Sequence, residues 1–270
     1  MKNPIIISGP CAVESRNQIM SCALSLQERK IEIIRASLWK PRTKPSFDGV
    51  GENGIPWFSE ITKLGLTAAT EVLTPDHVSS LANGINNSEG NLKNVLLWIG
   101  SRNQNHFIQQ EIAKRILNEF PKEVKLLIKN QPWKEDEHWF GIVEYILNSG
   151  FGKDRIILCH RGFSHNDLTQ TENFRNPPDF NLAMNVKLKT GLPMLIDPSH
   201  IGGTIENVFL AVNQSKVYDF DGLMVEVHST PTEAKTDPEQ QLSFAQFDKL
   251  ITNYNSRSSN PKWKEIIQQN

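Results

Sequence analysis

Short apolar runs alternate with longer amphipathic segments along the chain. The runs are nearly continuously aliphatic or β-branched, which is typical of parallel strands that are covered on both faces. They span residues 5–8, 31–36, 66–70, 95–99, 124–128, 155–159, 193–196 and 223–227. The helical spacing of apolar residues after each run predicts helices over 15–29, 53–63, 105–118, 135–147, 181–189, 205–217 and 238–251, with one more opened by Thr74 and Pro75.

Eight strand-then-helix units, with no linker or composition break between them, predict a single α/β domain with a parallel sheet. In a chain of 270 residues, eight units fit a closed (β/α)8 TIM barrel better than an open doubly wound sheet, because such a barrel takes about 250 residues. We expect the barrel to span residues 1–252 and residues 253–270 to form a polar C-terminal tail. Polar stretches over 86–94 and 164–179 are expected to be loops.

The charge balance and the cysteine count exclude several classes of protein. Lysine and arginine number 29 against 30 aspartates and glutamates, which gives a net charge of −1. A chain without a basic field is not expected to bind nucleic acid or an anionic membrane. Three cysteines are too few for a disulfide framework, and no apolar run approaches the ~20 residues of a membrane span. We therefore expect a soluble cytoplasmic protein, in which any phosphate site is a local cluster of cations.

Cations gather where the predicted strands end. In (β/α)8 enzymes the active site lies at the carboxyl ends of the strands, so the polar residues there are the candidates for chemistry. A single lysine or arginine at such a place is more often part of an ordinary surface ion pair. Several at one rim indicate a ligand with phosphate and carboxylate groups, to which guanidinium offers bidentate contacts. The candidates are Arg35, Lys40, Arg42, Arg102, Lys129 and Arg161.

A second group at the same rim could bind a divalent transition metal. Cys11, His200, Glu226 and Asp237 offer a thiolate, an imidazole and two carboxylates, and they come from different parts of the sequence. Each has a structural alternative. Cys11 could be a small buried hydrophobic residue, His200 a loop residue, and Asp237 the N-cap of a helix that starts at Pro238. Glu226 is the hardest to explain structurally, because an unpaired carboxylate among its apolar neighbours would be costly.

The other cysteines and the tryptophans are expected to be structural. Cys22 falls within a predicted helix and Cys159 within a predicted strand, so both are expected in the core. Trp98 is interpreted as a packing residue, and no role is given to His160.

Six short segments together resemble the 3-deoxy-D-arabino-heptulosonate 7-phosphate (DAHP) synthases. They are GPCAVES at 9–15, KPRT at 40–43, IGSRN at 99–103, CHRGF at 159–163, DPSHIGG at 197–203 and VEVH at 225–228. The resemblance runs from about residue 5 to residue 251, and it is specific because the motifs fall in order at the expected strand ends. It is closest to the compact branch without an internal regulatory domain, some of whose members are fused to chorismate mutase.

The resemblance implies a (β/α)8 barrel that condenses phosphoenolpyruvate with D-erythrose 4-phosphate. The products would be DAHP and inorganic phosphate, at the start of the shikimate pathway to aromatic amino acids. It implies one divalent metal ion, with Mn2+ preferred and Fe2+, Co2+ or Zn2+ also compatible. It further implies a homo-oligomer, either a dimer or a tetramer. Because no mutase or regulatory domain is evident in the sequence, no chorismate mutase activity is expected.

Matching the motifs residue by residue assigns roles. The metal ligands are Cys11, His200, Glu226 and Asp237. The phosphoenolpyruvate contacts are Arg35, Lys40, Arg102, Lys129 and Arg161, together with the backbone near Gly100 and Ser101. Glu71 matches a carboxylate that orders a water molecule, Asp197 lines the same cavity, and Arg42 and Thr43 match the aldose phosphate site. The candidate catalytic residues are therefore Lys40, Glu71, Asp197 and His200.

The sequence departs from the family pattern at a few positions, and rival functions stay open. Ser101 stands where alanine is usual, Asn130 where arginine is common and His160 where glutamate is, and the loop after Thr43 is slightly short. One rival is 3-deoxy-D-manno-octulosonate 8-phosphate synthase, which uses arabinose 5-phosphate. A second is a catalytically silent barrel that binds an anion. A third is a metal-independent aldolase that forms a Schiff base on Lys129.

Overall fold

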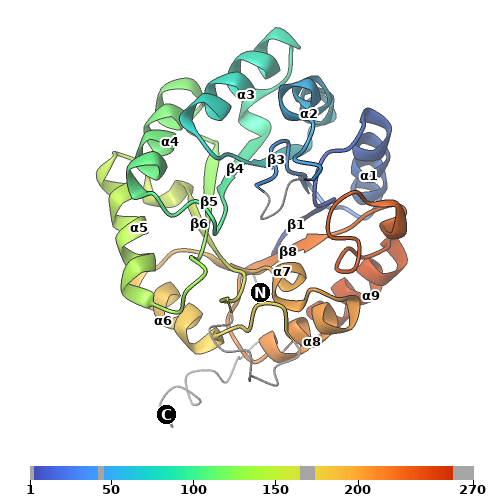
Figure 1. The fold of residues 1–270 in the computed structure, drawn as a ribbon, viewed down its shortest axis with the longest axis vertical. Coiled ribbons are helices and arrows are strands. Elements are labelled where there is room, and N and C mark those ends of the chain that lie inside the picture. Colours follow the sequence, from blue (N-terminus) through green and yellow to red (C-terminus); the bar gives the residue numbers. More distant parts are fainter. Residues whose placement is uncertain (1–2, 42–45, 165–173, 258–270) are drawn as a thin grey trace.

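A computed structural model describes residues 3–41, 46–164 and 174–257 of the chain. Within these residues, eight parallel strands follow one another around a closed barrel in sequence order, and β8 pairs with β1 to close it. The helices surround the strands as an outer ring (Figure 1). The predicted (β/α)8 TIM barrel is therefore confirmed.

All eight predicted strands are present, and their ends differ from the prediction by two residues or fewer. They are β1 (Ile5–Gly9), β2 (Ile33–Arg35), β3 (Thr67–Glu71), β4 (Val95–Ile99), β5 (Lys125–Lys129), β6 (Ile156–His160), β7 (Met194–Ile196) and β8 (Gly222–Glu226). The helices are α1 (Arg16–Glu28), α2 (Ile55–Lys63), α3 (Pro75–Asn87), α4 (His106–Glu119), α5 (Asp136–Asn148), α6 (Phe180–Thr190), α7 (Pro198–Gly202), α8 (Ile205–Ser215) and α9 (Phe244–Asn255). Short 3-10 turns are η1 (Gly51–Gly54), η2 (Leu92–Asn94), η3 (Lys153–Arg155) and η4 (Pro231–Glu233).

Side-chain caps decide where several helices begin. Thr74 accepts from the backbone N–H of His77 and precedes a proline, as the sequence predicted for the start of α3. Asn105 caps α4 in the same way. In α9 the Ser243 and Gln246 side chains form a reciprocal capping box. Each cap satisfies backbone donors that the helix itself leaves without a partner.

Two predicted elements are wrong in their bounds. The last helix begins at Phe244 and not at 238, because residues before Ser243 turn into the barrel mouth, where Leu242 pairs with β8 through Val227. Asp237 is not a helix N-cap; its φ is 46°. The predicted loop over 86–94 is partly helical, since α3 continues to Asn87 and η2 follows. The sequence also gave no indication of α7, a short helix directly after β7.

The core has two layers, which explains why the strands are apolar throughout. Val95, Leu97 and Ile99 of β4 point outward into the layer between strands and helices. Leu96 and Trp98 of the same strand point into the barrel, together with residues from the other strands. The predicted core cysteines fit this arrangement, with Cys22 in the outer layer and Cys159 in the inner one.

Among the helices of the described residues, none combines the length and the apolarity that crossing a membrane requires.

Candidate active site

The alternation of side chains along the strands delivers polar groups to one end of the barrel. Residues two apart in a strand face the same side, so the residue two positions after an inward apolar side chain also points inward. On five strands that next residue is charged. The inward pairs are Ile33 and Arg35, Ala69 and Glu71, Leu127 and Lys129, Leu195 and Asp197, and Met224 and Glu226.

Of these side chains, Arg35, Glu71 and Lys129 line a cavity of about 510 Å³ at the carboxyl ends of the strands. All the predicted anion-binding cations within the described residues line it or lie in its wall. The cavity lining includes Arg35, Lys40, Glu71, Gly100, Ser101, Arg102, Lys129, Arg161, His200 and Asp237. Arg42 and Thr43, predicted to bind the aldose phosphate, lie outside the described residues.

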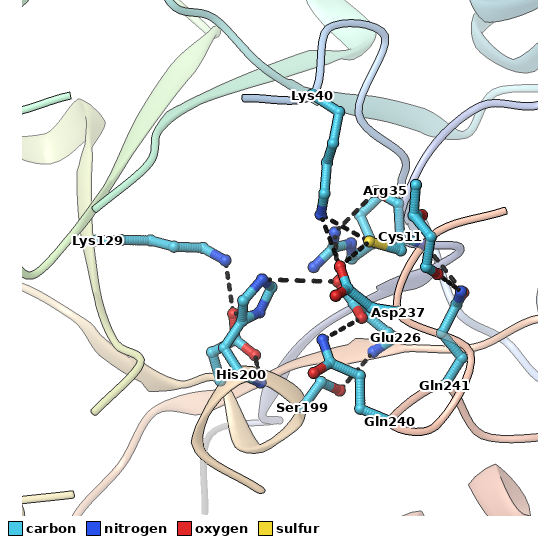
Figure 2. A network of polar contacts seen from close by, with 12 residues as sticks. Cys11, Arg35, Lys40, Lys129, Ser199, His200, Glu226, Asp237, Gln240 and Gln241 are labelled. Carbon is cyan, nitrogen blue, oxygen red and sulfur yellow. Dashed lines mark hydrogen bonds and ion pairs between the residues drawn. The ribbon is translucent and has the colours of Figure 1, made fainter. Parts of the chain in front are cut away.

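Four predicted metal ligands lie together at the ends of β1, β7 and β8. The Cys11 thiol donates to Asp237 Oδ2 at 3.2 Å, and His200 Nε2 lies 3.8 Å from Glu226 Oε1 (Figure 2). Lys40 reaches into the same cluster, with its Nζ 2.6 Å from Cys11 Sγ and 3.4 Å from Asp237 Oδ2. In the described part of the chain, no three histidine, cysteine or acidic side chains are placed so that they could hold an ion as they stand. The four predicted ligands lie in one cluster, and the Lys40 ammonium group contacts two of them.

Buried charges around this cluster compensate one another. Arg35 is 1% exposed, and its Nη2 lies 3.1 Å from Glu226 Oε1. Burial opposes the charge on Glu226, but Arg35, His200 and Lys40 outweigh it and lower the pKa of this carboxyl. Burial likewise disfavours the Lys40 ammonium, but the nearby carboxylates of Glu226 and Asp237 raise its pKa. The buried cluster therefore stays charged, because each ion has a counter-ion in contact.

The Cys11 thiol is protonated in this environment. Burial, with Glu226 adding to it, raises the pKa of Cys11 to about 12. Since metals bind the thiolate, metal binding here would release a proton, and it would tighten as the pH rises.

His200 is neutral and oriented by Asp197. Burial lowers the pKa of His200 to about 4, so the imidazole carries no charge at neutral pH. Its Nδ1 lies 2.8 Å from Asp197 Oδ2, and its backbone N–H donates to Asp197 Oδ1 at 3.0 Å, which caps α7. A proton on Nδ1 facing the carboxylate leaves the Nε2 lone pair for the cluster, which is the usual arrangement of a metal-binding histidine.

On the opposite side of the cavity, Lys129 and Asp197 form a buried ion pair with a distance of 2.5 Å. Burial opposes ionisation of Asp197, but His200 and Lys129 outweigh it and hold the pKa of that carboxyl well below its ordinary value. Asp197 therefore contacts both a cation of the anion-binding side and the histidine of the donor cluster.

Two arginines on this side donate to uncharged groups. Arg161 Nη1 donates to the Asn176 side-chain oxygen at 2.9 Å, and Arg102 Nη1 donates to the Pro41 carbonyl at 2.6 Å. Burial lowers the pKa of Arg161 to about 10, as expected for a cation removed from water without full compensation. This is the side on which an incoming anion gains most.

Glu71 lies between the two sides. Burial raises its pKa, although Lys40 and Lys129 act against the shift. A Cβ atom at Gly100 would overlap the Glu71 carboxylate, so glycine is required for this approach. Glu71 is thus a carboxylate held against the backbone of the IGSRN motif, next to the cations.

The sequence profile of the DAHP synthetase I family matches residues 2–259. The chain belongs to the DAHP synthetase I family. It is therefore an enzyme, and its Thermotoga maritima relatives are DAHP synthases, which are transferases.

Several relatives of this DAHP synthetase I family member have been described. The phospho-2-dehydro-3-deoxyheptonate aldolase of Thermotoga maritima is 33% identical over 249 residues, covering 91% of this chain and 67% of that protein. A crystal structure of a Thermotoga maritima DAHP synthase superimposes with a TM-score of 0.78 at 31% identity, covering 93% of this chain and 68% of that one. A truncated Thermotoga maritima form gives 0.75 at 28% identity, with coverages of 93% and 84%. The 2-dehydro-3-deoxyphosphooctonate aldolase of Aromatoleum aromaticum is 23% identical over 256 residues, covering 86% and 82%.

Trp98 and Arg175 are among the residues of this family member's cavity that sequence reasoning missed. Trp98 lines the cavity floor, and its ring lies 5.2 Å from the Arg35 guanidinium and 5.8 Å from Lys129 Nζ. Arg175 Nη1 contacts Asp237 Oδ1 at 3.2 Å and Gln240 Oε1 at 2.9 Å. The inward alternation of Leu96 and Trp98 could have revealed the first. Arg175 follows a long connection with no such period, so only the fold could place it.

The two departures flanking the matched cations are structural in this family member. Asn130 is buried and accepts from the Arg161 backbone N–H at 2.8 Å, while its amide donates to the Gly162 carbonyl. His160 is fully buried and accepts from the Asp179 backbone N–H at 3.1 Å. Asn130 therefore fixes the turn that carries Arg161, and His160 holds the residue that precedes α6.

Proposed function

We propose that the protein condenses phosphoenolpyruvate with D-erythrose 4-phosphate and water to give DAHP and inorganic phosphate. This would be the first step of the shikimate pathway. The observation that carries the proposal is the group of cations around one cavity, next to a cysteine, a histidine and two carboxylates. A chain with a net charge of −1 has no general reason to gather cations at one place. Family membership and the Thermotoga relative support the same reaction.

Phosphoenolpyruvate carries its carboxylate and its phosphate ester on the same carbon, so its site must offer cations on two sides of that carbon. Arg102, Lys129 and Arg161 offer them from three successive strand ends. Guanidinium groups contact both kinds of anion through paired N–H donors. Their contribution is mainly orientation, for which ~7–11 kcal/mol is the upper range in well-aligned reactions.

The donor set suits one divalent metal ion. Cys11, His200, Glu226 and Asp237 would hold it, because thiolate, neutral imidazole and carboxylates are ligands that Mn2+, Fe2+, Co2+ and Zn2+ accept. Mn2+ is the ion we expect. The neutral His200, with Nδ1 beside Asp197, supports the ligand role. A bound metal would supply Lewis-acid polarisation of the aldehyde oxygen.

In the proposed reaction, the methylene carbon of phosphoenolpyruvate forms a bond to the aldehyde carbon of the sugar phosphate. Water adds to the enol carbon, and phosphate leaves by cleavage of its C–O bond. Lys129 and Arg161 stay in contact with the anionic groups as charge develops on the departing phosphate. Glu71, whose pKa is raised by burial, orients the attacking water and can accept its proton. Lys40, beside Cys11 and Asp237, supplies a further cation near the sugar oxygen.

The assay follows loss of the enol absorbance of phosphoenolpyruvate, with Mn2+ and either aldose. We expect turnover with erythrose 4-phosphate, little with arabinose 5-phosphate, and loss of activity with a chelator that added Mn2+ reverses. Turnover with arabinose 5-phosphate alone would instead assign 3-deoxy-D-manno-octulosonate 8-phosphate synthase activity. This is the second candidate function, and the similarity to the Aromatoleum relative supports it. Binding of phosphoenolpyruvate without turnover of either sugar would indicate the silent anion-binding barrel.

The Schiff-base alternative is disfavoured by the surroundings of Lys129. Its Nζ lies 2.5 Å from Asp197 Oδ2 in a buried ion pair, and forming a Schiff base would break that pair. Borohydride reduction in the presence of substrate should leave Lys129 unmodified. The homo-oligomer and the cytoplasmic location stay predictions; light scattering tests the first and cell fractionation the second.

A further inference from the structure

Residues 174–177 connect two parts of the candidate active site. The Arg175 and Asn176 backbone N–H groups donate to the carbonyls of Gly202 and Ile201, at 3.3 and 3.1 Å, in the short helix α7. The Pro177 carbonyl accepts from the Phe163 backbone N–H at 3.0 Å, just after β6. The segment is therefore joined to the helix that carries His200 and to the strand end that carries Arg161.

The Asn176 side chain uses both ends of its amide in this position. Its oxygen accepts from Arg161 Nη1 at 2.9 Å, and its nitrogen donates to the His200 backbone carbonyl at 2.6 Å. Asn176 is 7% exposed, so both hydrogen bonds are shielded from water. One neutral side chain thus contacts a cation of the anion-binding side and the backbone of a donor-cluster residue.

The backbone around Arg161 is fixed by other contacts. Asn130 accepts from the Arg161 backbone N–H, and Gly162 has φ +78° with no room for a Cβ against the Asn176 carbonyl. Asn176, by contrast, contacts the guanidinium at the end of the Arg161 side chain. Removing the Asn176 amide should therefore release the Arg161 guanidinium without moving the end of β6.

We propose that Asn176 is a positioning residue that holds the Arg161 guanidinium toward the incoming anion and the His200 segment toward the donor cluster at once. The identity of the anion rests on the function proposed above. A neutral amide is required, because an aspartate would keep the acceptor for Arg161 but neutralise its charge. An aspartate would also lose the N–H group that donates to the His200 carbonyl, and it would place a negatively charged oxygen against that carbonyl oxygen.

Two binding measurements on the purified chain test the proposal. Calorimetry gives the Kd of phosphoenolpyruvate and of inorganic phosphate in metal-free protein, and separately the Kd of Mn2+ without anion. Asn176→Ala should weaken both anion binding and Mn2+ binding by about tenfold, because it loses a contact on each side. Arg161→Gln should weaken anion binding and leave Mn2+ binding within about twofold.

Asn176→Asp provides the sharper variant because it is nearly isosteric. It should bind phosphoenolpyruvate more weakly than Asn176→Ala does, although it fills the same space. Asn185→Ala is the matched control: this asparagine donates to Asp136 Oδ2 from α6, away from the cavity, and its loss should change neither Kd. A melting temperature is recorded for every variant.

Three results would overturn the proposal. One is an Asn176→Ala protein with either Kd within twofold of the wild type. Another is an Asn176→Asp protein that binds phosphoenolpyruvate as tightly as the wild type. The third is a wild-type protein that binds neither anion nor Mn2+. If the wild type binds inorganic phosphate and Mn2+ in an Asn176-dependent way but never turns over, the positioning role stands and the proposed reaction fails.

Discussion

Beside β1 and β8, the carboxylates Glu226 and Asp237 contact the cations Arg35, Lys40 and Arg175. Beside β4 and β6, the guanidinium groups of Arg102 and Arg161 donate to uncharged oxygens. The first side of the cavity balances its own charge, and the second carries the positive charge of Arg161, which burial makes costly. An anion therefore gains most on the second side, while a metal ion on the first must compete with resident cations for the same carboxylates.

Asp197 joins the two sides, and removing its partner should have the largest effect. Lys129→Met leaves a buried carboxylate without its cation and removes an anion contact. We expect kcat/KM to fall at least about 1,000-fold and the free energy of unfolding to fall by about 3 kcal/mol. Steady-state kinetics and chemical denaturation measure the two effects. The double variant Lys129→Met/Asp197→Asn should recover the free energy of unfolding but not the activity. If the free energy of unfolding is not recovered either, the unpaired Asp197 charge is not the cause of the lost stability.

Cys11 tests the donor side. Mutation of a residue that only contacts a metal ligand typically weakens metal binding ~10–100-fold. Because we expect Cys11 to bind the metal itself, Cys11→Ala should weaken Mn2+ binding by more than that, and the barrel should stay folded. Cys22→Ala is the control, since that buried cysteine lies in the outer core. Calorimetry with Mn2+ and circular dichroism read out binding and folding. Unchanged Mn2+ affinity in Cys11→Ala would remove Cys11 from the ligand set.

His160 tests how the cationic side responds to acid. Burial lowers its pKa to about 3 from an ordinary 6.5, so the unfolded chain takes up this proton first as the pH falls. This group therefore costs no stability above pH 6.5, and the loss grows below it, to about 2 kcal/mol at pH 5. His160→Gln, which keeps a side-chain acceptor for the Asp179 N–H, should flatten the dependence by that amount. Denaturation at pH 7 and pH 5 measures it, and parallel losses in both proteins would contradict the assignment.

Arg175 should give the smallest effect, because its side chain is about half exposed. Exposed ion pairs contribute ~0–1 kcal/mol, so Arg175→Gln should leave stability nearly unchanged. Since the side chain lines the cavity beside Asp237, we expect the KM of the sugar phosphate to rise by up to about fivefold at constant KM for phosphoenolpyruvate. Steady-state kinetics with each substrate varied in turn gives the two KM values separately. An equal rise in both KM values would show that Arg175 does not contact the sugar phosphate specifically.

The strands and most cavity residues could be predicted from the sequence because both follow local periods. A strand buried on two faces is apolar throughout, and the side chain two positions beyond its last inward residue must enter the barrel mouth. Asp197 and Glu226 were predictable for this reason. The family resemblance added roles for these residues and did not change their positions.

Other features depend on contacts between distant segments, which no local period encodes. Asp237, readable as a helix cap, instead adopts φ 46° and lies against Cys11, 226 positions away in sequence. Arg175 and Asn176 follow an irregular connection and reach the site only because their backbone bonds to α7. The sequence by itself determined the barrel, the inward-facing charges and the donor types. Only the tertiary structure decided which charges are in contact, because the pairing of buried ions depends on distances set by the closure of the whole barrel.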